Sequence, residues 1–463
     1  MHLRQSITLA LAVVVGWSVA RPARAQEQDT TRIPTGVQLG LVYQTAYRPS
    51  LAVRPFSTTD SAALADAADR VFGIVRRDLD YSDRFDMQFD IPPALAKGPV
   101  DYGAWNDLNV VYLLTGGLEP AQEGGTVLRL TLHDVVYSTI KEMSSFHLPS
   151  VDDPGFRMAV HAASDQVVRW ATGNPGIAAS RVLFTVQNPQ DRTSREILIV
   201  DSDGENLQSV VTSQSEVQSP AWSPDGSHMV FTERAPDGWR LEERDMRTGR
   251  IRMVGAQSTL YLTPSYSPDG TKLVFGMWQA GNSDLYEYDI SRYCCLRQLT
   301  HSTRVDMYPS FSPDGKQLAF MSDRLGQPHI FIMPADGGEA TVISPFVYGE
   351  PGFYTSPDWS PTNSYVAFHG RSIGGRFQVM VADASHPGAT VQQLTSEGRN
   401  EDPSWAPDGR HLVFSGMRGT GVGLYVIDSV TGRIRPLVLG RRYRVPAWSG
   451  SLLQASALTV RAP

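Results

Sequence analysis

One short phrase recurs through the last two-thirds of the sequence and constrains the fold more than any other feature. Its complete form is an aromatic residue followed by Ser-Pro-Asp-Gly, first found at Trp222–Gly226. Three later copies are degenerate, and the last is shortened to Trp-Ser-Gly. The steps between aromatic positions are 44, 45, 48, 46 and 43 residues, and these positions are Trp222, Tyr266, Phe311, Trp359, Trp405 and Trp448. A period in the forties, built from strands and turns, is typical of β-propeller blades.

Each repeat carries the residues needed for four short strands joined by tight turns. Pro presets φ, Asp caps the turn and Gly accepts a positive φ, so Pro-Asp-Gly predicts the turn after the first strand. Apolar runs such as 228–231 and 284–289 predict second and third strands, and 297–300 predicts a short fourth strand. We therefore interpret the Asp of each phrase as a turn cap and not as a ligand.

The two ends of the repeat array complete one another. Residues 181–186 resemble a second strand that has no first strand before it, whereas 445–448 resemble a first strand with nothing after it. Pairing the two would close the ring and remove the exposed edges of an open array. The sequence thus predicts six blades over residues 176–450, closed by the C-terminal strand, followed by a tail at 451–463.

The N-terminus indicates export. Residues 1–25 combine Arg4, an apolar run and Ala23-Arg24-Ala25, which predicts a secretory signal cleaved between Ala25 and Gln26. No cysteine for lipid attachment stands at that site, and no other run is long enough to span a membrane. The formal charge is −7 for the whole chain, which argues against nucleic acid or an anionic membrane surface as a main partner.

Residues 50–175 predict a separate small α/β domain, preceded by an arm and first strand at 26–49. Residues 26–34 are polar and should be free, while alternation from Val37 to Tyr43 predicts a strand that joins the sheet of this domain. The predicted elements of the domain are a strand at 51–56, a helix at 60–80, a short helix around Trp105, strands at 110–114, 127–136 and 140–148, and a helix at 153–172.

The order of these parts closely resembles the TolB family, the periplasmic component of the Tol-Pal system. The resemblance covers residues 50–450 and rests on the repeats, on Ala52–Phe56, on Asp78–Phe85 with Asp83 where Gly is usual, and on the helix from His161 to Val168. It implies a non-catalytic, monomeric periplasmic scaffold without a cofactor or metal. It also implies binding of the OmpA-type lipoprotein Pal at the propeller and of the inner-membrane protein TolA by the N-terminal arm, in support of outer-membrane integrity and constriction.

Several other residue patterns bear on whether the chain is an enzyme or a metal-binding protein. There is no G-x-S-x-G nucleophile motif, and the glycine-rich stretch 416–423 lies between two strands, which favours a hairpin loop. Residues 201–206 begin like a calcium loop but depart from its spacing, so a plain turn is favoured. His161 and Asp165 suggest a hydrogen-bonded pair one helical turn apart. Cys294 and Cys295 allow either a vicinal disulfide or two unpaired thiols.

The most promising site is the mouth of the propeller channel, because residues just upstream of each repeated aromatic should surround it. Its mixture of Tyr, Arg and carboxylates suits a protein surface. The alternative function is a secreted propeller enzyme or glycan-binding protein, similar to a polysaccharide lyase, that uses the channel. The candidate partner-binding residues are Gln218, Tyr261, Thr263, Arg304, Asp306, Tyr308, Tyr354, Glu401, Asp402, Tyr443 and Arg444.

Overall fold

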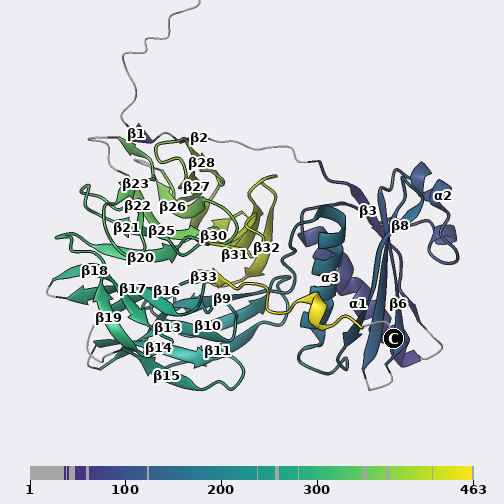
Figure 1. Ribbon diagram of the computed structural model, residues 1–463, viewed down its shortest axis with the longest axis horizontal. Helices are drawn as coiled ribbons and strands as arrows, with labels where there is room; N and C mark the ends of the chain where they lie inside the picture. Colours follow the sequence, from purple (N-terminus) through teal and green to yellow (C-terminus); the bar gives the residue numbers. More distant parts are fainter. Residues whose placement is uncertain are drawn as a thin grey trace, which may run out of the picture. The chain divides into compact units, whose positions relative to one another are not determined.

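The computed structural model describes residues 36–37, 39–40, 47–58, 62–121, 125–236, 238–255, 260–279, 281–347, 352–371, 375–419 and 421–460 (Figure 1). The predicted signal, the cleavage site between Ala25 and Gln26, and the polar arm at 26–34 lie outside these residues. The described chain contains a small α/β domain and a β-propeller, as the sequence predicts.

The α/β domain is a mixed sheet with two long helices. The strands are β3 (Ser50–Val53), β4 (Ser57–Thr58), β5 (Asp86–Gln88), β6 (Tyr112–Pro120), β7 (Thr126–Asp134) and β8 (Thr139–Leu148). They lie in the order β5-β3-β6-β7-β8, with β4 beside β6. Helices α1 (Ala62–Tyr81) and α3 (Phe156–Thr172) pack against one another and against this sheet, and Gly173 in the left-handed conformation ends α3.

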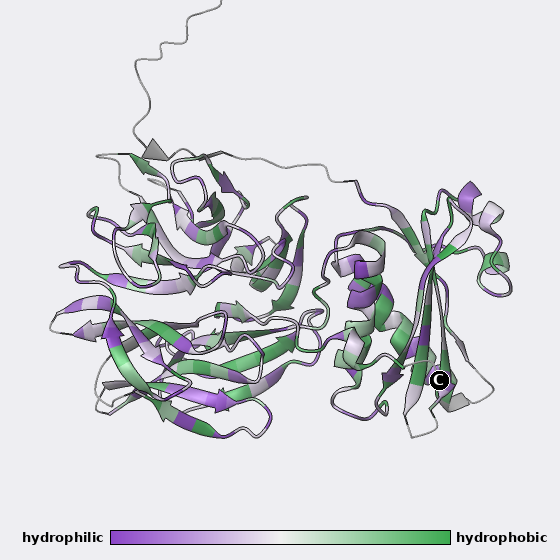
Figure 2. Ribbon diagram, viewed as in Figure 1, coloured by the Kyte–Doolittle hydropathy of each residue, from purple (hydrophilic) through white to green (hydrophobic). Residues whose placement is uncertain are grey.

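Two cores cover the two faces of this sheet because side chains alternate along its strands. Leu51 and Val53 of β3 belong to the larger core with the apolar faces of α1 and α3. Ala52, between them, packs instead with Trp105 of the short helix α2 (Tyr102–Asp107). Figure 2 shows apolar residues along the strands and on the helices.

Six four-stranded blades form the propeller, which confirms the predicted count. Blade 1 has the order β33-β9-β10-β11, so the C-terminal strand pairs beside β9 and closes the ring. Its strands are β9 (Arg181–Gln187), β10 (Ser194–Asp201), β11 (Gln208–Thr212) and β33 (Tyr443–Trp448). Blade 2 consists of β12 (Val217–Trp222), β13 (His228–Ala235), β14 (Gly238–Asp245) and β15 (Ile251–Val254). Blade 3 consists of β16 (Leu260–Tyr266), β17 (Lys272–Gln279), β18 (Asn282–Asp289) and β19 (Cys294–Gln298).

The remaining blades follow the same antiparallel order. Blade 4 consists of β20 (Asp306–Phe311), β21 (Gln317–Ser322), β22 (His329–Pro334) and β23 (Thr341–Val342). Blade 5 consists of β25 (Phe353–Trp359), β26 (Tyr365–Arg371), β27 (Gln378–Asp383) and β28 (Val391–Gln393). Blade 6 consists of β29 (Arg399–Trp405), β30 (His411–Arg418), β31 (Gly421–Asp428) and β32 (Ile434–Leu439).

The repeated phrase forms a capped turn in each of its complete copies. In the first, the Asp225 carboxylate accepts a bond from Ser223 Oγ at 2.6 Å and another from the Ser227 amide at 3.0 Å. The second copy repeats both contacts around Asp269, and the third repeats them around Asp314. These aspartates therefore serve as turn caps, as predicted.

The prediction that an N-terminal strand joins the α/β sheet is wrong. Strand β1 (Gly36–Val37) pairs with β24 (Phe346–Val347), and β2 (Leu39–Gly40) adds in parallel to the outer strand β28 of blade 5. The rest of the alternating segment, 41–43, lies outside the described residues. Period-2 alternation identifies a strand but not its partner, and here the free outer edge of a blade supplies the partner.

The chain after the last blade returns to the α/β domain. The Leu458 carbonyl accepts a bond of 2.8 Å from the His147 amide, and the Val460 amide donates to the Ser145 carbonyl at 2.9 Å. The short helix η2 (Ala455–Ala457) follows β33 in the chain, and Ala455 is part of the larger α/β core. The segment after residue 450 thus contributes to both folded parts.

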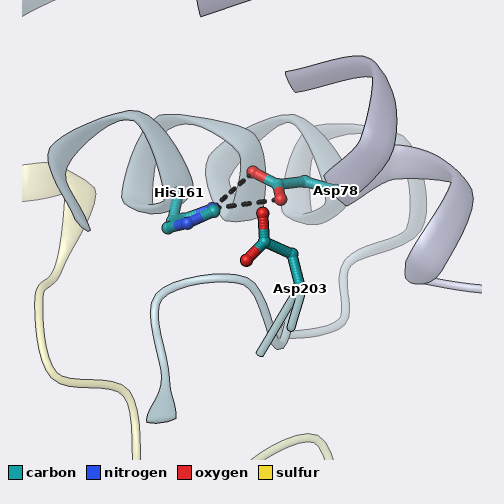
Figure 3. A group of neighbouring side chains, drawn as sticks. All are labelled: Asp78, His161 and Asp203. Atoms are coloured by element: carbon teal, nitrogen blue, oxygen red, sulfur yellow. Dashed lines mark hydrogen bonds and ion pairs between the residues drawn. The ribbon is translucent and has the colours of Figure 1, made fainter. Parts of the chain in front are cut away.

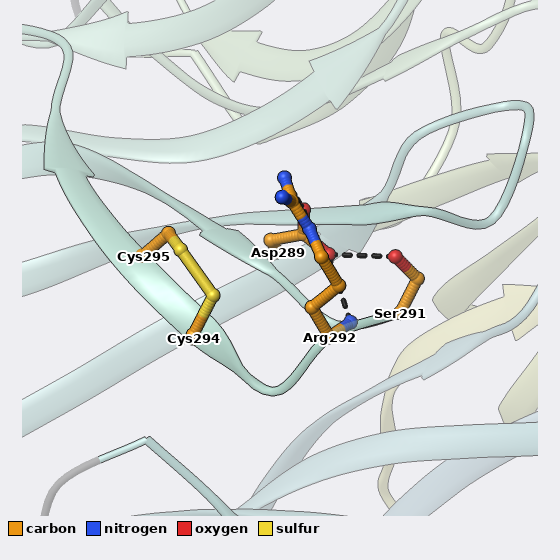
Figure 4. Close-up of a disulfide and its surroundings, with 5 residues drawn as sticks. All are labelled: Asp289, Ser291, Arg292, Cys294 and Cys295. Atoms are coloured by element: carbon orange, nitrogen blue, oxygen red, sulfur yellow. Dashed lines mark hydrogen bonds and ion pairs between the residues drawn. A yellow bond between two sulfur atoms is a disulfide. The ribbon is translucent and has the colours of Figure 1, made fainter.

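Cys294 and Cys295 form a disulfide between adjacent residues at the start of β19 (Figure 4). The sequence had left this pairing open. The preceding turn is capped by the Asp289 carboxylate, which accepts bonds from Ser291 Oγ at 2.7 Å and from the Arg292 amide at 2.9 Å.

Candidate functional site

The inner strands of all six blades surround a central channel with a cavity of about 140 Å³. Each inner strand presents the same local structure, in which a residue with φ between 48° and 56° precedes a proline. The strand register shifts at each of these positions, so each is a β-bulge. The residues with positive φ are Ser219, Thr263, Tyr308, Ser356, Asp402 and Val445.

The sequence signal for this ring is a proline two residues before every repeated aromatic, and the sequence reasoning missed it. Proline has no amide hydrogen, so it is tolerated in an inner strand only where the ladder is interrupted. Its six occurrences are Pro220, Pro264, Pro309, Pro357, Pro403 and Pro446.

Side chains that follow three of these prolines join neighbouring blades. The Trp359 amide donates to Ser310 Oγ at 2.9 Å, the Trp405 amide to the Asp358 carboxylate at 2.7 Å, and the Trp448 amide to Ser404 Oγ at 3.1 Å. Burial raises the pKa of Asp358 to about 6 against the opposing effect of its hydrogen bonds. The channel wall is therefore fixed by polar contacts between blades as well as by apolar packing.

The charged part of the mouth gathers where blade 6 meets blade 1. Arg444 of β33 places Nη1 2.6 Å from Glu401 and Nε 3.0 Å from Asp402, both of β29. Arg399 contacts the other oxygen of Glu401 at 2.8 Å. Although burial raises the pKa of Asp402, the Arg444 guanidinium lowers it below its ordinary value. These groups form a fixed, internally neutralised network.

The remaining polar groups of this network are neutral near pH 7. Burial lowers the pKa of His369, whose Nδ1 accepts the Asp402 amide hydrogen at 2.9 Å. Burial and the nearby Asp402 carboxylate raise the pKa of Tyr308 to about 12, so its phenol stays protonated. The arrangement can accept and donate hydrogen bonds and present charge, which suits recognition of a surface.

The structure brings the predicted mouth residues to the same end of the inner strands but does not expose them all. Asp306 is fully buried and paired with Arg324 at 3.1 Å, and Tyr354 packs on His329 with ring centroids 5.3 Å apart. Tyr443 packs on Phe184, also inside. Arg304 is exposed; Gln218, Thr263, Tyr308 and Arg444 are partly exposed, and Glu401 and Asp402 are buried. The side chain of Tyr261 in β16 lies outside the described residues.

A second polar centre joins the α/β domain to blade 1 (Figure 3). His161 of α3 donates from Nδ1 to the Asp78 carboxylate of α1 at 2.9 Å, and its Nε2 lies 4.0 Å from Asp201 of β10. Burial alone would lower the pKa of His161, but Asp78 and the nearby Asp203 and Asp201 raise it. The sequence expectation that His161 pairs with Asp165 is wrong.

Asp165 instead binds the backbone of the linker that joins α3 to the propeller. Its carboxylate accepts the Ala178 and Ala179 amides at 2.8 and 2.9 Å, while burial raises its pKa to about 7. Gly176 lies so close that a Cβ there would fall 2.0 Å from Asp165 Oδ1.

A third centre joins the α/β domain to blade 6. The buried His411 of β30 lies between Asp408, at 2.8 Å, and Asp83 of the α1–β5 turn, at 3.2 Å. Burial would lower the pKa of His411, but these carboxylates raise it to about 9. Asp83 also contacts Arg433 at 2.8 Å.

Both histidine centres place a His nitrogen and two carboxylate oxygens within 4.8 Å, a spacing that could hold a metal ion. The carboxylates already have cationic partners, however. Asp203 is 2.6 Å from Arg157 and 3.3 Å from Arg77, and Asp428 is 2.6 Å from Arg410. Because arginine and imidazolium balance the acidic charge, these centres fit a structural role better than a dication site.

Among the described residues, every helix is too short or too polar to cross a bilayer.

Comparison with known proteins identifies both folded parts. A profile of the TolB β-propeller domain matches residues 168–452, and one of the TolB amino-terminal domain matches residues 39–140. A relative in Acinetobacter baylyi, named Tol-Pal system protein TolB, is 27% identical over 258 residues, which are 55% of this chain and 56% of the relative. Its namesake in Alcanivorax borkumensis is 28% identical over 240 residues, 50% of this chain and 52% of the relative.

This chain thus aligns with about half the length of each of these relatives. The crystal structure of TolB from Acinetobacter baumannii shares the fold, with a TM-score of 0.76 at 24% identity over 89% of this chain and 100% of that one. Because the propeller profile alone covers more than half of the sequence, the chain belongs to the TolB family.

Proposed function

We propose that this chain is a non-catalytic periplasmic scaffold of a Tol-Pal-like system that binds an OmpA-type lipoprotein at the channel mouth. The names of its relatives place those proteins in the Tol-Pal system, which supports the same assignment for this chain. The observation that carries the site is the fixed network of Arg444, Glu401 and Asp402, with Tyr308 beside it.

A preorganised polar surface of this kind favours protein binding. Its side chains are held by ion pairs before a partner arrives, so little conformational entropy is lost on association. Around it, Arg304 and Arg399 are exposed and can contact carboxylates of a partner. The role at the cell envelope is to link the lipoprotein to the rest of the system, in support of outer-membrane integrity and constriction.

The test is recovery of an OmpA-type lipoprotein from native periplasm by the tagged full chain. A mouth variant combining Arg304→Glu and Tyr308→Ala should lose on the order of 2 kcal/mol or more of binding free energy, because central Tyr and Arg contacts dominate such interfaces. The matched control is Arg250→Glu, an exposed arginine in the β14–β15 turn. Equal recovery by the mouth variant and the control would exclude this face.

The second proposed partner is a TolA-like inner-membrane protein, bound by residues 26–34. A free polar segment can order on contact and add a strand to its partner. Deleting residues 26–34 stops short of β1, which starts at Gly36 and pairs with β24. The deletion should therefore preserve the melting temperature and lipoprotein binding while removing TolA-type binding. A deletion variant that unfolds would show the segment to be structural.

A further inference from the structure

A cleft of about 800 Å³ opens at the seam where the ring of blades closes. One wall is the hairpin between β9 and β10 of blade 1, and the other is formed by β30, β31 and the loop before β33. The cleft is distinct from the channel cavity, which is lined by the six proline bulges. Between the cleft and the charged mouth lies a crevice of about 20 Å³ that Arg442 and Arg444 share.

Arginine dominates the charge of this cleft. Its lining contains Arg192, Arg195, Arg441 and Arg442, against Glu196 as the acidic residue. Asp191 holds Arg195 at 3.0 Å, and Gln187 accepts a long bond of 3.4 Å from Arg442.

The guanidinium groups of Arg192 and Arg441 make no ion pair or hydrogen bond with any residue in the described part of the chain. Both side chains are exposed. The chain as a whole carries 48 acidic against 41 basic residues. The cleft, with four arginines and one carboxylate in its lining, is therefore locally basic within an acidic chain.

Part of the lining of the cleft is apolar. Val186, Pro189, Met417 and Val422 contribute to it, and Met417 is 44% exposed. An unbranched, polarisable methionine can adapt to the shape of an incoming apolar group. Arginines beside apolar residues match a ligand that carries both carboxylates and apolar side chains.

We propose that this cleft binds an extended acidic segment of a partner protein, with its carboxylates on the arginines and an apolar side chain against the apolar lining residues. Arginine recognises carboxylates by paired N–H donors, which a planar guanidinium presents in fixed geometry. An anionic membrane is a poorer fit because the site is concave and the chain as a whole is acidic. The inference goes beyond lipoprotein binding at the channel mouth and does not depend on it.

The experiment uses the full chain and a fluorescein-labelled peptide of about twelve residues that contains glutamates and two leucines, read by fluorescence anisotropy. Two comparison probes are the same peptide with Gln in place of Glu and the same acidic peptide with Ser in place of Leu. The cleft variant is Arg192→Gln with Arg441→Gln. The matched control is Arg247→Gln with Arg250→Gln, which removes the same charge from the exposed β14–β15 turn. Thermal unfolding verifies that both variants are folded.

The wild type and the control should bind the acidic leucine peptide with equal affinity. The cleft variant should bind it about tenfold or more weakly, because two charge-assisted contacts are lost. The Gln and Ser peptides should also bind more weakly, and binding should fall as salt is raised. Three results would overturn the proposal: no measurable peptide binding, equal binding by the cleft variant, or equal loss in the control. Polyphosphate or phosphatidylglycerol vesicles that bind through the same arginines while the peptide does not would also overturn it.

Discussion

The buried His411 centre makes a prediction about stability and pH. Its imidazolium lies 2.8 Å from Asp408 and 3.2 Å from Asp83, so it bridges blade 6 and the α/β domain. Folding raises the pKa of His411 from 6.5 to about 9. Because a tenfold change in proton affinity corresponds to about 1.4 kcal/mol, the folded state gains roughly 3 kcal/mol from binding this proton.

The sign of the pH dependence follows from the direction of that shift. A raised pKa in the folded state gives stability that is fully present below the unfolded pKa of 6.5 and is lost as the pH rises through about 9. Between pH 7 and pH 10 the wild type should therefore lose on the order of 2 kcal/mol of stability from this group.

The assay is the free energy of unfolding in urea for the wild type and His411→Gln at pH 7 and pH 10. Glutamine keeps hydrogen-bonding capacity but cannot carry the charge, so the difference in unfolding free energy between the two proteins should narrow by on the order of 2 kcal/mol at the higher pH. The control is His386→Gln, since His386 is exposed and its Nδ1 contacts Asp383 and Ser385 of its own turn. A gap that stays constant or widens with pH would refute the assigned role of the imidazolium.

Three further perturbations test the fold. Removing residues 442–463 deletes the closing strand and leaves the inner edge of β9 unpaired, so the melting temperature should fall by many degrees; a fall within about two degrees would contradict closure. Gly176→Ala should destabilise by about 1–3 kcal/mol in urea unfolding, since its Cβ would meet Asp165; an unchanged midpoint would show that this contact relaxes freely. Cys294 and Cys295 should resist alkylation of the native oxidised protein and accept two labels after reduction, as read by intact mass; labelling without reductant would contradict the disulfide.

The sequence was most informative where structure is local. Pro-Asp-Gly turns and their spacing specify each blade by themselves, so the blade count and the closure by β33 could be predicted. The predicted partner of the strand at 36–40 was wrong because a strand pairs with whichever edge is free, and the free edges are a property of the assembled fold. His161 likewise pairs with Asp78, 83 residues away in the chain, and not with Asp165, because the packing of α1 on α3 brings the two residues together.

The candidate site was predicted in position but only partly in exposure. Counting back from each aromatic locates the correct end of the inner strand. Asp306 and Tyr354 are buried by contacts with Arg324 and His329 that alternation does not reveal. Arg304 is exposed in the loop before β20. The bulge at each positive-φ residue depends on how six inner strands crowd around one axis, although the repeated proline is its visible trace.

The most direct test of lipoprotein binding at the mouth is photo-crosslinking in living cells. A benzophenone amino acid at Arg304 would lie on the exposed rim of the mouth, and one at Arg250 would lie in the β14–β15 turn. We predict that position 304 captures an OmpA-type lipoprotein, identified by mass spectrometry, and that position 250 does not. Capture from position 250 with none from position 304 would contradict the proposed function of this surface.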